Sequence, residues 1–324
     1  MFLRIAKKQL FSTYLANQAF QFSSVAKLHH IYEPCKNPHS KWNLIMLHGI
    51  LGSGRSFKSV VKSPMISSLV NTYMVDLRNH GNSEHKESMT YKEMADDVYN
   101  FVRENRLGPD LIVLGHSMGA RVAMEMAVTY PEAMKGVVVV DLAPYNYRDD
   151  YRFTFPEDLL WKFQKLSQIN LKQDIRHIRT EIFEIADSLA EGELFASNLV
   201  NIHGQYKWRI NLDSILKNYM SQIIKDLDYR GNKTYPGPVK VICGEKSDYV
   251  APDIVHTFHK PFEQFLKQRD LVWIENADHW VHYSQPYLFT AEVSQFLQSV
   301  IHPQEPEIID PFPSSFRDIY LDSS

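Results

Sequence analysis

Cysteine, long apolar runs and a charge of one sign are all scarce in this sequence, and each absence excludes a class of protein. Only two cysteines, Cys35 and Cys243, occur among 324 residues, so neither a disulfide framework nor a cysteine-ligated metal site is expected. No apolar run reaches the roughly 18 residues that cross a bilayer. Lysine and arginine number 35 against 38 acidic residues, and the net charge of −3 offers no electrostatic basis for binding nucleic acid.

Short apolar runs that alternate with helix-like segments are what the sequence does contain. Six runs are almost continuously apolar, as expected of strands buried on both faces of a sheet. They are Leu44–Leu47, Tyr73–Leu77, Leu111–Leu114, Val137–Val140, Val239–Ile242 and Leu271–Ile274. Thr90 and Glu93 have the spacing of a capping box and predict the start of a helix after the second run. This alternation predicts an α/β fold, with a mainly parallel central sheet flanked by helices.

The alternation is interrupted in the middle of the chain, which predicts an insertion. We expect residues 23–144 and 236–301 to form one core. Residues 145–235 are rich in charged and helix-forming residues with almost no strand pattern, and predict a helical lid over a site at the strand ends. Residues 302–324 contain four prolines and several acidic residues, and predict an extended C-terminal tail.

The first residues have a composition of their own. Arg4, Lys7 and Lys8 lie among serines and aromatics, and the first acidic residue is Glu33. The lysines interrupt the apolar run that a secretory signal needs, whereas a basic segment without acids is typical of a mitochondrial transit peptide. We therefore predict a presequence over residues 1–22 and a location in the mitochondrial matrix. The alternative is a basic amphipathic helix that packs on the domain.

A serine between two glycines stands where the third apolar run meets a helix-like segment. Residues 113–127 read VLGHSMGARVAMEMA, and contain the pattern Gly115-x-Ser117-x-Gly119. A strand that reverses into a helix within a few residues strains the serine and leaves no room for neighbouring Cβ atoms. In this context the pattern predicts a nucleophile elbow, with the serine at a helix N-terminus where developing negative charge is favoured.

A serine hydroxyl is a weak nucleophile and needs a base, which in this architecture follows the last strand. The stretch NADHWVHYSQP comes directly after that strand and offers His279 and His282. We predict His279, at the start of the loop, as the base and His282 as a structural residue.

The base needs a carboxylate to orient it, and two strand ends offer one. Asp141 ends the run VVVVD, and Asp248 lies in the loop CGEKSDYVAP after the next strand. Parallel strands end at one edge of the sheet, so both carboxylates are within possible reach of the histidine.

An oxyanion hole requires two backbone N–H donors. We predict one from Met118, which follows the serine, and one from Ile50 in the loop after the first core strand. Gly49 lets that loop turn, and His48 is interpreted as a residue that hydrogen-bonds within the turn.

Five stretches together resemble the α/β-hydrolase superfamily: LHGILGS, DLRNHGNS, GHSMGA, VVVVDLAPYNY and NADHWVH, which span residues 44–282. DLRNHGNS with GHSMGA and ADHWVH is most similar to a narrower branch of mitochondrial serine hydrolases and their bacterial esterase relatives. The resemblance implies an α/β-hydrolase fold and hydrolysis of a small acyl substrate, an ester or thioester. It also implies that no metal or organic cofactor takes part.

The resemblance also bears on the triad acid. The wider superfamily places it after the strand Val239–Ile242, which implies Asp248, whereas the narrower branch implies Asp141. Ser247 stands where the usual acid would be, one residue before Asp248. We expect a triad of Ser117, His279 and Asp141, with Asp248 as the alternative acid.

The predicted function is hydrolysis of an ester or thioester through an acyl-enzyme. Carbon–carbon bond hydrolases and acyltransferases of the same fold also use a serine, and the sequence does not exclude either activity. The alternative of another class is a catalytically idle structural or accessory subunit of a mitochondrial assembly. No protein partner is indicated by the residues themselves.

Overall fold

The computed structural model describes residues 25–225, 227 and 234–303. The predicted presequence lies outside the described residues, as does the predicted tail from residue 304 onward. None of the described helices combines the length and the apolar character needed to cross a bilayer.

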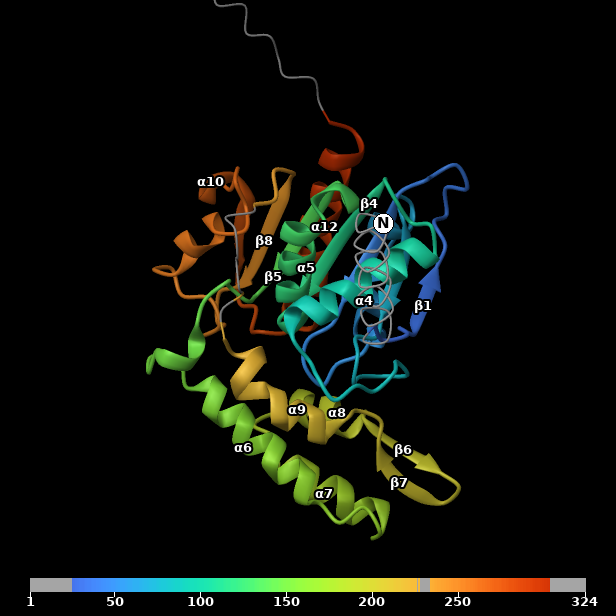
Figure 1. Cartoon of the computed structure of the whole chain (residues 1–324), viewed down its shortest axis with the longest axis vertical. Helices are drawn as coiled ribbons and strands as arrows, with labels where there is room; N and C mark the ends of the chain where they lie inside the picture. The colour runs from blue at the N-terminus through green and yellow to red at the C-terminus, as the bar shows by residue number, and fades with distance from the viewer. Residues whose placement is uncertain (1–24, 226, 228–233, 304–324) are drawn as a thin grey trace, which may run out of the picture.

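A seven-stranded sheet forms the centre of the molecule, in the order β1-β3-β2-β4-β5-β8-β9 (Figure 1). Every neighbouring pair is parallel except β1 with β3. The strands are β1 His30–Glu33, β2 Asn43–Leu47, β3 Asn71–Val75, β4 Leu111–His116, β5 Gly136–Val140, β8 Val239–Gly244 and β9 Leu271–Ile274. The predicted α/β fold with a mainly parallel sheet is confirmed. The edge strand β1 was not predicted, because its half-exposed residues form no apolar run.

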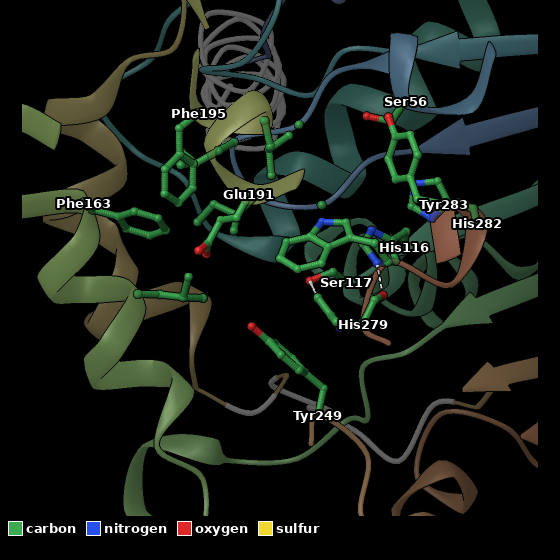
Figure 2. A pocket seen from close by; sticks show the side chains of 17 residues that line it. Ser56, His116, Ser117, Phe163, Glu191, Phe195, Tyr249, His279, His282 and Tyr283 are labelled. Carbon is green, nitrogen blue, oxygen red and sulfur yellow. Dashed lines mark hydrogen bonds between the residues drawn. The ribbon is translucent and has the colours of Figure 1, made fainter. Parts of the chain in front are cut away.

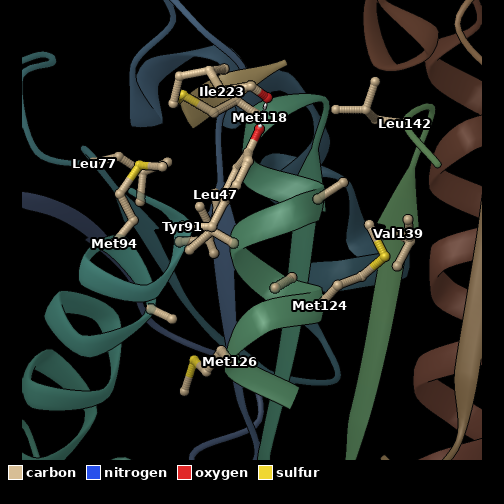
Figure 3. Packing of buried hydrophobic residues seen from close by; sticks show 14 of the residues in the cluster. Leu47, Leu77, Tyr91, Met94, Met118, Met124, Met126, Val139, Leu142 and Ile223 are labelled. Carbon is tan, nitrogen blue, oxygen red and sulfur yellow. Dashed lines mark hydrogen bonds between the residues drawn. The ribbon is translucent and has the colours of Figure 1, made fainter. Parts of the chain in front are cut away.

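Helices cover both faces of the sheet and divide the core into two clusters of buried side chains. On one face α4 packs on α5, and α5 packs on β4 and β5, where Met124 lies beside Val139 (Figure 3). On the other face α12 packs against α2, α3 and β8. The capping box predicted at Thr90 is present at the start of α4. The core helices are α2 Lys58–Lys62, α3 Pro64–Ser67, α4 Tyr91–Glu104, α5 Met118–Thr129, α10 Lys267–Asp270, α11 Val281–Ser284 and α12 Pro286–Ile301.

The segment predicted to be a helical lid gathers at one end of the sheet (Figure 1). It contains α6 Phe155–Gln168, α7 Ile175–Ile185, α8 Leu189–Ala196, α9 Leu212–Asn218 and a π-helical turn over Tyr219–Ile223. It also contains a hairpin of β6 Leu199–Ile202 and β7 Gln205–Trp208, which the prediction of a helical lid did not include.

The hairpin was missed because its strands are short and partly exposed, and so lack a buried apolar run. The signal that marks it is the two-residue turn at His203 and Gly204. Both residues have positive φ, 52° and 84°. Such turns match the twist of the strands they join, and glycine at the second position favours them.

The strand register brings the ends of four strands to one edge. Leu47 pairs with Gly115, His116 with Val140, and Val140 with Ile242. The residues that follow these positions therefore emerge side by side. They include Ser117 after β4 and Asp141 after β5, which places two predicted site residues on neighbouring strands.

Candidate active site

Ser117 occupies a strained turn between β4 and α5. Its φ of 54° and ψ of −121° are rare for a residue with a side chain. A Cβ atom at Gly115 would lie 2.0 Å from the carbonyl oxygen of Gly119, and one at Gly119 would lie 2.3 Å from that of Leu47. Real Cβ atoms do not approach backbone so closely, so both glycines are sterically required. The turn therefore exists at this point because two residues lack side chains.

His279 connects the serine to a carboxylate. Its Nε2 lies 3.0 Å from the Ser117 hydroxyl, and its Nδ1 lies 2.7 Å from Oδ2 of Asp141. The carboxylate accepts from Nδ1–H, so Nε2 is left to accept from the serine. All three residues are buried, with Asp141 fully so. This tautomer is the one that a general base for Ser117 requires.

Asp141 is held by groups from the end of β8 and from the loop that follows it. The Gly244 N–H donates to its Oδ1 at 3.0 Å, and the Ser247 hydroxyl donates to its Oδ2. Asp248 is exposed, and within the described residues no hydrogen bond links its carboxylate to His279. Of the two candidate acids, the structure brings only Asp141 to the histidine.

The two residues predicted to supply the oxyanion donors lie beside Ser117 in the fold. Ile50 and Met118 both line a cavity that Ser117 borders. Neither backbone N–H donates a hydrogen bond to another described residue; Met118 is the first residue of α5, where N–H groups lack an acceptor within the helix. His48 fixes the loop as interpreted from the sequence, since it donates to Gly49 O at 2.7 Å and accepts from Leu77 N–H at 3.0 Å.

Two side chains that contact His279, Tyr249 and His116, were not assigned from the sequence, and His282 packs behind them. Tyr249 stacks on the His279 ring at 3.5 Å between centroids and 13° between planes. The His116 Nε2–H donates to the His279 carbonyl at 2.8 Å. His282 lies edge-on to His116, and burial lowers its pKa to about 3, so it stays neutral. The structural assignment of His282 thus agrees with its buried, uncharged position.

Arg121 joins the lid to the serine's own helix, and sequence reasoning missed it. It lies one turn after Ser117 on α5 and is fully buried. Its guanidinium donates to the carbonyl oxygens of Ala143 and Tyr145, where the chain leaves the core for the lid. It also donates to Ile223 and Lys225, where the chain returns. One side chain therefore ties both ends of the lid to the site.

Three cavities lie near the serine and His279, beneath the lid; Ser117 lines two of them. One of about 40 Å³ borders Ser117 and His279 and is lined from the lid by Phe163, Glu191 and Phe195 (Figure 2). A wider cleft of about 950 Å³ opens beside His279. A third cavity, of about 20 Å³, is lined by Ser117, Ile50 and Met118. Access to the serine is therefore shaped by the lid.

A mainly parallel sheet with a serine on a strained turn after its central strand defines the class of α/β hydrolases. The chain belongs to the alpha/beta hydrolase family, whose sequence profile matches residues 44–293.

Named relatives lie in the same family. The chain is 29% identical over 261 residues to the sn-1-specific diacylglycerol lipase ABHD11 of Danio rerio. This match covers 79% of this chain and 78% of the relative. The same protein of Mus musculus is 28% identical, and the match covers 78% of this chain and 80% of the relative. A solved structure of a marine microorganism esterase is 28% identical, covers 83% of this chain and 100% of its own, and has a TM-score of 0.72. These matches, with a Haemophilus influenzae relative, confirm the resemblance to the branch that holds ABHD11 and bacterial esterases.

Proposed function

We propose that the protein is a serine hydrolase that cleaves an ester or thioester bond of a small-molecule substrate. The observation that carries the proposal is the position of His279, hydrogen-bonded to Ser117 on one side and to Asp141 on the other. The relatives named diacylglycerol lipase and esterase support ester substrates.

The mechanism follows from the roles of these atoms. Ser117 Oγ attacks the carbonyl carbon while His279 Nε2 takes its proton, and Asp141 stabilises the imidazolium that forms. The N–H groups of Ile50 and Met118 bind the oxyanion, each contributing about 3 kcal/mol to the transition state. His279 then protonates the leaving group, and in the second half it activates a water that releases the acyl group.

The first test is labelling with a fluorophosphonate, which reacts only with an activated serine. We expect wild-type protein to be labelled and to hydrolyse p-nitrophenyl butyrate, and Ser117→Ala to lose both while keeping its folded circular-dichroism spectrum. Ser56→Ala is the matched control, because Ser56 lines the same cavity without bonding to His279. A folded Ser117→Ala protein with full activity would falsify the proposal. Product analysis with added ethanol distinguishes hydrolysis from acyl transfer.

The rival hypothesis is an idle structural or accessory subunit. A purely structural role requires no hydrogen-bonded serine, histidine and carboxylate, and no strained turn beneath a cavity. These features support the enzyme. Well-folded wild-type protein that resists the probe and every acyl substrate would favour the rival instead.

We also propose that the protein acts in the mitochondrial matrix. The support is the basic, acid-free composition of residues 1–22, which lie outside the described residues. Imaging a full-length fluorescent fusion beside one that lacks residues 1–22 tests this. Mitochondrial targeting that survives the deletion would contradict the role given to this segment.

A further inference from the structure

Tyr249 lies against a face of the proposed base, and no step of the proposed mechanism uses it. Its ring and the imidazole of His279 are nearly parallel, with 13° between planes and 3.5 Å between centroids. Two other rings near the imidazole are inclined to it. Trp280 lies at 69° and 5.6 Å, and His116 at 44° and 4.9 Å. Among the described rings, Tyr249 is therefore the one that covers a face of the base.

The backbone of Tyr249 fixes the place of this ring. Its N–H donates to the Ser247 hydroxyl at 3.2 Å, and its carbonyl oxygen accepts from the Tyr147 hydroxyl at 2.6 Å. The Ser247 hydroxyl in turn donates to Asp141, the carboxylate that orients the base. The ring, the base and the acid are thus held by one connected set of contacts.

A ring from the lid supports the other face of Tyr249. Phe155, the first residue of α6, stacks on Tyr249 with 4.0 Å between centroids and 20° between planes. Two rings so close to one centroid cannot share a face, so Tyr249 lies between Phe155 and His279. The Tyr249 hydroxyl points toward the lid and makes no hydrogen bond with a described residue (Figure 2). The contacts of this side chain are therefore made by its ring.

The geometry of the stack suits a charged imidazole better than a neutral one. A separation of 3.5 Å is about the contact distance of two carbon atoms, so the rings of Tyr249 and His279 are hardly offset. Two neutral rings prefer an offset or edge-to-face arrangement. A cation is instead attracted to the face of an aromatic ring within about 6 Å of its centroid. His279 is only 8% exposed, so little water weakens this attraction.

The imidazole acquires its charge during the reaction. Ser117 Oγ forms a bond to the carbonyl carbon, an electron pair of the C=O bond moves to the oxygen, and the hydroxyl proton passes to His279 Nε2. The same imidazole takes a proton from water in the second half of the reaction. The stack on Tyr249 is therefore stronger in both transition states than in the ground state, and such interactions increase kcat.

We propose that Tyr249 is a positioning residue, whose ring orients the imidazole of His279 and stabilises the imidazolium that forms there. Phe155 of the lid assists by supporting the opposite face of that ring. This inference rests on the proposed function, since it requires His279 to accept the Ser117 proton. It goes beyond that function by making one lid residue part of the support of the base.

The experiment weakens the negative charge of the ring face while keeping the shape of the ring. Tyr249 also lines all three cavities, so a smaller side chain would change the space for substrate as well. Tyr249→Phe keeps the face, and we expect kcat and KM for p-nitrophenyl butyrate within about twofold of the wild type. Difluorophenylalanine and then trifluorophenylalanine at this position withdraw electrons from the face in steps. We expect kcat to fall about 3- to 10-fold along this series while KM stays constant.

A double-mutant cycle tests the support from the lid. Tyr249→Leu removes the face and should lower kcat about 10- to 30-fold. Phe155→Leu alone should lower kcat about 2- to 5-fold, and should add nothing to Tyr249→Leu, because the ring that it supports is gone. Phe183→Leu is the matched control within the lid. Phe183 packs against Arg179, lines none of the three cavities, and its variant should stay within about twofold of the wild type.

The outcomes separate this inference from the proposed function. Protein that is labelled by a fluorophosphonate, but whose kcat is the same throughout the fluorinated series, overturns only the role of Tyr249. A loss in Tyr249→Phe as large as in Tyr249→Leu does the same, because the hydroxyl would then be responsible. Additive losses in the cycle overturn the role of Phe155. Protein that is neither labelled nor active overturns the proposed function as well. The fluorinated series decides the matter even where Tyr249→Leu fails to fold.

Discussion

At the scale of single residues, the proposed triad depends on two backbone positions of the same kind. Ser117 and Asp141 each follow the last residue of a strand, and each has a positive φ, 54° and 53°. Such a conformation costs a residue with a side chain about 1–2 kcal/mol. Neighbouring hydrogen bonds hold both residues there, from Ser117 N–H to Val140 O and from Asp141 N–H to Ile242 O. Local strain is thus retained where two side chains must turn toward one histidine.

The choice of acid is testable at this scale. Asp141→Asn leaves the geometry nearly unchanged but removes the acceptor that sets the histidine tautomer, so we expect kcat to fall about 10³- to 10⁴-fold with little change in KM. Asp248→Asn is the matched control and should stay within twofold of the wild type. Steady-state kinetics on p-nitrophenyl butyrate measure both. A larger loss for Asp248→Asn would transfer the acid's role to that residue.

At the scale of elements, the lid and the nucleophile helix are mechanically connected. Arg121 on α5 binds carbonyls at both ends of the lid segment, and Phe155 at the start of α6 stacks on Tyr249 with 4.0 Å between centroids. Tyr249 in turn stacks on His279. The rings of Phe155, Tyr249 and His279 therefore form one continuous stack from the lid to the proposed base.

At this scale we predict that the hydrogen bonds of Arg121 to both ends of the lid, here called the clamp, stabilise the fold. Arg121→Met keeps much of the side-chain length but leaves buried carbonyls without donors, so we expect about 2–4 kcal/mol less free energy of unfolding. Urea denaturation measures the loss, and limited proteolysis should show earlier cleavage within the lid. Arg152→Met is the control, because Arg152 is 46% exposed in its side chain and pairs with surface carboxylates. Unchanged stability and lid protection in Arg121→Met would contradict the clamp.

At the scale of the whole molecule, the core around the site contains several buried neutral histidines. Burial lowers the pKa of both His80 and His282 to about 3, and lowers those of His48 and His116 as well. In the unfolded chain these groups titrate near 6.5. Below pH 6.5 these histidines bind protons in the unfolded state but stay neutral in the folded state. The free energy of unfolding therefore decreases as the pH falls from 6.5 toward 3.

The predicted pH dependence is therefore acid lability. Each buried histidine contributes a slope of up to about 1.4 kcal/mol per pH unit in this window. His282→Phe removes one such group in a site bordered by Phe57 and Phe289, where neither ring nitrogen has a described partner. Urea denaturation from pH 7 to pH 4 should give a shallower loss of stability for the variant. Parallel curves for variant and wild type would refute the assignment.

Part of this architecture was predictable because buried parallel strands and helix caps leave local patterns. The six apolar runs became β2, β3, β4, β5, β8 and β9, with β3 shifted two residues toward the N-terminus. Strands β1, β6 and β7 were missed because exposed strands lack a continuous apolar run. Local pattern thus indicates what is buried on two faces and misses what lies at an edge.

For the site, the sequence by itself determined the residues whose function depends on a local turn. The turn at Ser117 requires Gly115 and Gly119, and this requirement can be predicted from a stretch of five residues. Only the tertiary structure decided which acid meets His279, because Asp141 lies 138 residues away from it in the chain. The same holds for Arg121 and Tyr249, whose partners depend on where the lid packs. The physical reason is that covalent neighbours set a turn, whereas a hydrogen bond across the fold depends on strand register and packing that no short stretch encodes.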